Sequence, residues 1–236
     1  MAQYSALMVM KRLYGPDKIR RFLKYELDDY LRGRRGEAVE ELPLARVENQ
    51  PYIHYNKGSV ALYLLQDRLG EARVNAMLRG LLDRYRFKGR PYARSTDLVA
   101  GFASLARDGQ ERQLVTDLFE RIVLWDFEAK DATTRRLPDG RWETLLTVNA
   151  AKFTANGQGV ETPVPFADTI DVGAFASRPG LAAFSRADVL AMKRRPLRSG
   201  GQQVRIVTAA RPAFVGVDPY NKYIDRNSDD NLVAPS

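Results

Sequence analysis

The chain has 236 residues, of which 44% are hydrophobic and 28% are charged, with a formal net charge of +8. This composition is typical of a soluble globular protein, and the length allows one large domain or two modest ones. The absence of cysteine excludes disulfides, thiolate nucleophiles and cysteine-ligated metals. No segment approaches the roughly 20 apolar residues of a membrane span, so we expect a soluble chain.

The first half of the sequence predicts about six helices. Gly15-Pro16 separates the first two, Gly70-Glu71 separates two more, and Ser95-Thr96-Asp97 is a typical helix start. The expected helices cover residues 2–14, 16–31, 55–69, 71–82, 95–105 and 111–125. The third is apolar almost all round, which indicates a central position in a bundle.

The pattern changes to short strands near residues 126–131. Asp139-Gly140, between two stretches rich in Thr, Leu and Val, predicts a hairpin, and Asn156-Gly157 predicts another turn. Further strands are expected at 169–175, 204–208 and 213–217, while residues 177–201 are expected to be irregular. Residues 221–231 suggest a closing flap. These features favour an antiparallel sandwich.

The basic residues are for the most part interspersed with acidic ones. The densest clusters, Arg32–Arg35 and Lys193–Arg198, fall in expected loops. We therefore interpret the charge as a solvated basic surface and expect no nucleic-acid partner. Contact with an anionic membrane surface or polymer is the alternative that this charge leaves open.

The segment Pro51–Gly58 carries the most specific motif, Tyr55-Asn56-Lys57-Gly58. It resembles the Tyr-Glu-Lys-Gly motif of the gluzincin aminopeptidases, zinc enzymes that remove N-terminal residues from peptides. Asn56 stands where that family commonly has Glu. In the family the tyrosine donates its O–H to the developing oxyanion. The resemblance thus implies a catalytic Tyr55, whereas residue type alone favours a tyrosine that packs at a helix start.

Three other segments resemble the same family in the correct order. Residues 2–8 resemble the stretch just after the third zinc ligand, a Glu that would fall upstream of Met1. Residues 117–126 resemble the end of the helical subdomain, which is the least specific match. Residues 217–227 resemble the C-terminus of bacterial members, some of which are fused to a membrane permease-like segment.

The zinc ligands of the family are missing from this chain. A catalytic zinc of this type takes two His and one Glu, with the histidines arranged as His-Glu-x-x-His on one helix. His54 is the only histidine. We therefore expect zinc in the parent enzyme, no metal or other cofactor in this chain, and no turnover by the chain alone.

Other candidate residues are better explained by structure. No serine or cysteine motif accompanies His54, so we expect it to be structural or at the surface. Tyr52 could line the same cleft as Tyr55, but packing is the preferred role. The acidic pairs Asp28-Asp29 and Asp229-Asp230 are interpreted as surface and tail charge.

Together these observations predict an α+β multidomain chain. Residues 1–128 would form an all-α bundle, the C-terminal half of a thermolysin-like catalytic domain, and residues 129–236 a β-sandwich. The expected function is the C-terminal part of a zinc aminopeptidase. The alternative is a non-catalytic interaction or scaffold module with a degenerate peptidase fold.

The resemblance also implies the partners of this chain. They are the missing N-terminal zinc-binding part of the same polypeptide and, in the parent, a peptide substrate. Membrane association is expected only through a segment outside this chain. The compartment stays open, and the resemblance allows a membrane-anchored bacterial parent.

Overall fold

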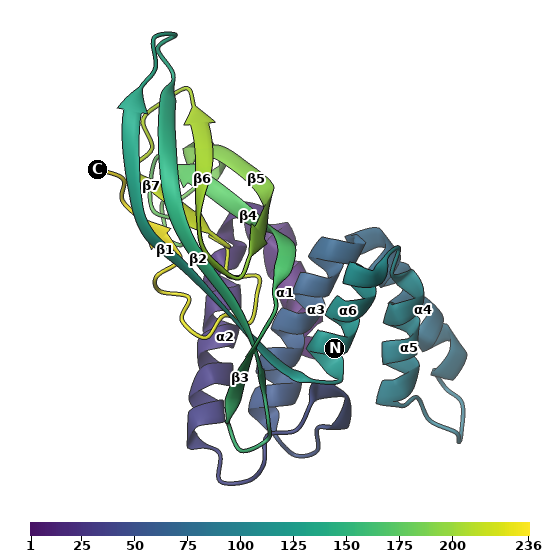
Figure 1. Ribbon diagram of the computed structural model, residues 1–236. Helices are drawn as coiled ribbons and strands as arrows, with labels where there is room; N and C mark the ends of the chain where they lie inside the picture. Colours follow the sequence, from purple (N-terminus) through teal and green to yellow (C-terminus); the bar gives the residue numbers. More distant parts are fainter.

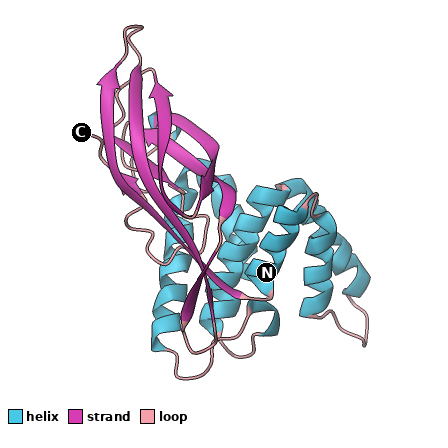
Figure 2. Cartoon of the chain, in the orientation of Figure 1, coloured by secondary structure: helices cyan, strands magenta, loops and turns pink.

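The computed structural model describes all 236 residues, and it contains six α-helices followed by antiparallel strands, an α+β arrangement (Figures 1 and 2). The helices are α1 (Ala2–Tyr14), α2 (Ile19–Gly36), α3 (Gly58–Leu69), α4 (Glu71–Tyr85), α5 (Ser95–Leu105) and α6 (Gly109–Phe119). Short 3₁₀ turns occupy Pro16–Lys18 and Leu44–Arg46, and a π-helical turn occupies Tyr52–Lys57. No helix of the chain combines the length and apolar character needed to cross a membrane.

The central helix is α3, as its sequence predicts. Every residue from Gly58 to Gln66 is buried, because α1, α2, α4 and α6 pack around it. A helix surrounded in this way has no polar face, which explains why its apolar residues show no amphipathic period.

The last predicted helix is wrong at its C-terminal end. We expected it to reach Trp125, but α6 ends at Phe119 and strand β1 begins at Ile122. The run from Ile122 to Trp125 is buried on both faces of the strand. A short, continuous apolar run fits a buried strand and a buried helix equally well, so periodicity could not separate the two.

The strands form two four-stranded antiparallel sheets. The first sheet contains β1 (Ile122–Arg136), β2 (Trp142–Ala155), β3 (Glu161–Val164) and β6 (Gly200–Thr208). The second has the order β5 (Val189–Arg198), β4 (Ala167–Phe175), β7 (Phe214–Val217) and β8 (Leu232–Val233). The predicted Asp139-Gly140 turn joins β1 to β2, with Gly140 at a φ of 84°.

Two expectations for the second half are corrected. The segment expected to be irregular contains β5, which pairs with β4 at the edge of its sheet. An edge strand tolerates both its cations and Pro196, which is why it lacks a strand-like pattern. The expected flap is instead packed into the fold, with Tyr223 and Ile224 buried.

One continuous core connects the helices with both sheets. The same apolar cluster includes Leu65 of α3, Val148 of β2 and Val172 of β4. Residue 128, the expected end of the helical part, lies inside β1. The division into two domains stays a prediction, and the two predicted parts share one hydrophobic core.

Candidate functional site at the π-helical turn

The segment that contains Tyr55-Asn56-Lys57-Gly58 forms the π-helical turn Tyr52–Lys57, which leads directly into α3. Its widened hydrogen bonding is shown by the N–H of Gly58, which donates to the C=O of Ile53 five residues earlier. Such turns are rare and occur frequently at functional sites. Here Ile53 and Lys57 are buried, whereas Tyr55 is 52% exposed. The buried side chains of Ile53 and Lys57 therefore hold the turn against the fold, while Tyr55 faces solvent.

Tyr55 has one close aromatic neighbour, His54. The two rings meet edge to face, with centroids 4.4 Å apart and planes at 65°. The predicted structural role of His54 agrees with this packing, since the contact involves ring edges and not a proton-transfer hydrogen bond. His54 therefore packs against one side of the Tyr55 ring.

Lys57 is the buried anchor of the turn. Its Nζ lies 3.2 Å from Oε1 of Glu41 and 5.0 Å from the centroid of the Tyr30 ring. Glu41 also accepts hydrogen bonds from the Tyr30 hydroxyl (2.7 Å) and from Nε of Arg34 (2.8 Å). Burial lowers the pKa of Lys57, and Glu41 opposes that shift. Sequence reasoning missed Glu41, because nothing in its polar surroundings marks it as the partner of a lysine 16 residues away.

Asn56 joins the turn to the start of the chain. Its Nδ2 donates to Oε2 of Glu26 at 2.7 Å, and Gln3 donates to the other carboxylate oxygen. Glu26 is only 3% exposed. The first turn of α1, the middle of α2 and the residue after Tyr55 are therefore held together by one buried carboxylate.

Tyr52 has the packing role that we expected. Its ring stacks on that of Tyr30, with centroids 6.1 Å apart and planes at 15°. Gly33 of α2 allows this approach, because a Cβ there would lie 2.5 Å from Cβ of Tyr52. Real side chains do not approach so closely, so α2 needs a glycine at the point where it passes Tyr52.

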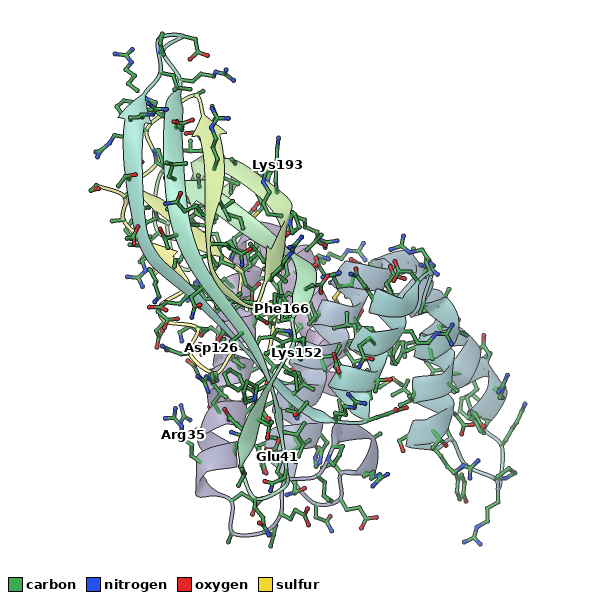
Figure 3. All side chains as sticks on the ribbon, in the orientation of Figure 1. Arg35, Glu41, Asp126, Lys152, Phe166 and Lys193 are labelled. Atoms are coloured by element: carbon green, nitrogen blue, oxygen red, sulfur yellow. The ribbon has the colours of Figure 1, made fainter.

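A surface hollow of about 550 Å³ lies beside the Glu41 cluster. It is lined mainly by charged residues of the α2 end and the following loop, together with the β2–β3 turn: Arg34, Arg35, Glu37, Glu40, Glu41 and Gly157. Figure 3 shows Glu41 near β3 and Arg35 on the outer side of α2. The hollow does not include Tyr55, so the motif and the hollow are separate features.

Three of the four aspartates in the acidic pairs noted in the sequence form ion pairs, whereas Asp230 accepts a hydrogen bond from Nδ2 of Asn227. Nζ of Lys24 lies 3.0 Å from Asp28 and 2.9 Å from Asp229, which joins α2 to the C-terminal segment. The Lys24 hydrogen bond holds the pKa of Asp229 below its ordinary value. No group of three or more His, Asp or Glu side chains in the chain is arranged to hold a metal ion.

A second buried polar cluster holds the C-terminal segment. Nζ of Lys222 lies 2.7 Å from Asp67 and 2.8 Å from Asp171. Burial alone would lower the pKa of Lys222, but the two carboxylates outweigh it and raise that pKa. The cluster therefore links the C-terminal segment around Lys222 to α3 and β4.

Comparison of the sequence with protein-family models finds no match, and comparison with curated protein sequences finds none either.

Proposed function

We propose that this chain is the C-terminal part of a gluzincin-type zinc aminopeptidase and supplies Tyr55 as the donor to the oxyanion of the tetrahedral intermediate. The observation that carries the proposal is the exposure of Tyr55 on a π-helical turn whose neighbours Ile53 and Lys57 are buried. A phenol held on a rigid support and open to solvent can reach a ligand without reorganising the protein, which is the requirement for oxyanion stabilisation.

The contacts of Asn56 support the proposal. In the family resembled, a Glu commonly follows the tyrosine, whereas here Asn56 donates to the buried carboxylate of Glu26. A carboxylate at position 56 would face that of Glu26, so the amide is the side chain compatible with this neighbour. The same carboxylate accepts a hydrogen bond from Gln3, so Glu26 joins the first turn of α1 to the residue that follows Tyr55.

In this proposal the helices form the second half of a thermolysin-like catalytic domain, and the two sheets form a sandwich behind it. The parent enzyme supplies zinc through its own N-terminal part and takes a peptide as substrate. This chain contributes the tyrosine and part of the cleft wall. Alone it is inactive, because its single histidine cannot complete a site of two His and one Glu.

The first experiment uses the chain itself. We expect no stoichiometric zinc after dialysis and no hydrolysis of an aminoacyl chromogenic substrate. Stoichiometric zinc together with turnover would contradict the claim that the chain is inactive alone. The encoding gene gives an independent test: an upstream His-Glu-x-x-His and a later Glu support the proposal, whereas a natural start at Met1 contradicts it and favours the scaffold alternative.

A second experiment uses the complete natural polypeptide that the gene encodes. Tyr55→Phe removes only the hydroxyl, and we expect kcat to fall by roughly 10²–10³-fold, as for other oxyanion donors. Tyr25→Phe is the matched control, because Tyr25 is also exposed but lies on α2. Equal activities of the two variants would remove Tyr55 from the mechanism.

A further inference from the structure

The connection between α4 and α5 exposes apolar side chains at the edge of the molecule. We call residues 86–94 the α4–α5 loop, and every one of them is exposed. Phe87 is fully exposed, Tyr92 is 66% exposed, and Leu82 in the last turn of α4 is 51% exposed. Three large apolar side chains within eleven residues thus face water at one tip of the fold.

The same loop concentrates positive charge. It contains the basic residues Arg86, Lys88, Arg90 and Arg94 and no acidic residue. Arg86 lies 3.4 Å from Asp83, at an exposed site where an ion pair contributes little. Two other basic clusters, Arg32–Arg35 and Lys193–Arg198, also lack acidic residues, but the α4–α5 loop combines its cations with the exposed rings of Phe87 and Tyr92.

The backbone at Phe87 is strained. Its φ of 58° lies in the left-handed region, which bulky residues other than glycine rarely adopt. A fully exposed ring gains no burial energy within the fold to offset this conformation. Strained residues cluster at positions that contact ligands, so the conformation of Phe87 points to a contact outside the chain.

We propose that the α4–α5 loop binds the surface of an anionic lipid bilayer, with Phe87 and Tyr92 among the headgroups and the four cations on the lipid anions. Aromatic rings prefer the headgroup level of a bilayer, and clustered Lys and Arg are attracted to anionic leaflets. The two contributions together give reversible surface binding without a spanning helix. The proposal is independent of the proposed peptidase function and involves none of the residues around Tyr55.

The shape of the tip favours a flat surface. In Figure 1 the loop lies at the lower right, at the opposite end of the molecule from the β1–β2 hairpin, and a bilayer can approach it without meeting the sheets. Single-stranded nucleic acids bind in basic grooves that track the backbone and offer successive stacking faces. This loop is a projecting tip, and its third apolar residue, Leu82, has no ring to stack.

The test is co-sedimentation of the full chain with phosphatidylcholine vesicles that contain or lack about a third phosphatidylserine. We expect binding only to the anionic vesicles, and loss of binding as salt screens the charges. Phe87→Asn removes the ring while keeping a residue that tolerates the left-handed conformation, and we expect it to weaken binding about tenfold. Phe87→Trp keeps an aromatic ring and should bind like the natural chain.

Charge variants separate this loop from the general basic surface. Lys88→Gln with Arg90→Gln should weaken binding roughly 25-fold, about fivefold for each cation. The matched control is Arg112→Gln with Arg136→Gln, two exposed arginines elsewhere on the chain, which should bind like the natural chain. Equal loss in both pairs, or no preference for anionic vesicles, would overturn the proposal. So would tighter, Phe87-dependent binding to single-stranded oligonucleotides than to the vesicles.

Discussion

The ammonium of Lys57 lies 3.2 Å from the carboxylate of Glu41, and both side chains are almost completely buried. Lys57 is one of three donors to this carboxylate, beside Tyr30 and Arg34. Glu41 is therefore the acceptor on which the group depends, and the start of α3 is tied to α2 through it. The two partners of this ion pair should respond differently to substitution.

Glu41→Leu should destabilise the protein more than Lys57→Met. The first change leaves a buried ammonium and a buried hydroxyl without an acceptor, at a cost of about 3–5 kcal/mol. The second leaves Glu41 with Arg34 and Tyr30, and we expect a loss of about 1–3 kcal/mol. Urea unfolding of both variants measures the difference. A larger loss for Lys57→Met would show that Glu41 is not the central acceptor.

Tyr55→Phe should leave the free energy of unfolding within about 0.5 kcal/mol of the natural value, because the side chain is half exposed. Tyr30→Phe is the matched comparison. It removes a buried hydrogen bond to Glu41, and we expect a loss of about 1–2 kcal/mol. Thermal or urea unfolding distinguishes them. A destabilised Tyr55→Phe would mean that the hydroxyl serves the fold and is not kept for a ligand.

Gly33→Ala should destabilise the protein by about 1–3 kcal/mol, because its Cβ would lie 2.5 Å from Tyr52 and force α2 away from the π-helical turn. Gly80→Ala is the control inside α4. Its Cβ would meet nothing within 4 Å, so we expect a gain of about 0.5–1 kcal/mol from helix propensity. If both variants lose stability equally, close contact at Gly33 is not the cause.

Stability should fall between pH 5 and pH 8 through Asp218. Burial raises the pKa of this carboxyl to about 7, although the backbone N–H groups of Lys222 and Tyr223 oppose the shift. Because the pKa of Asp218 is higher in the folded state than in the unfolded chain, binding its proton stabilises the fold. This stabilisation is complete below the pKa of the unfolded chain and is lost as pH rises through about 7.

The variant that tests this dependence is Asp218→Asn. We expect the natural chain to lose about 2–3 kcal/mol more than the variant between pH 5 and pH 8 in urea unfolding. Burial also raises the pKa of Asp230, to about 6. The free energy of unfolding of the variant should therefore still fall with pH, but less steeply than that of the natural chain. Identical slopes would show that Asp218 ionises outside this window.

Much of the helical half could be predicted from sequence, because the signals are local. The apolar spacing within residues 2–14 and the Gly70-Glu71 break gave the helix positions, which the structure confirms within a few residues. The Asp139-Gly140 hairpin is equally local, since a glycine with positive φ is needed where the two strands reverse. The candidate Tyr55 came from a motif, and its catalytic role stays a prediction.

The features that sequence reasoning missed depend on partners far along the chain. The run Ile122–Trp125 is a strand because β2 and the tail pair with it, and the N–H of Trp125 donates to the C=O of Ile224 at 2.9 Å. Residues 189–198 form a strand because β4 supplies their hydrogen bonds.

The amino-acid sequence by itself determined most of the helix positions and the reversal at Asp139-Gly140. Tertiary structure decided that Tyr55 faces solvent, that Lys57 is buried on Glu41, and that the tail belongs to the core. The physical reason is that spacing and turn residues report on neighbours a few positions away. Burial and ion pairing are set by segments that meet only after folding.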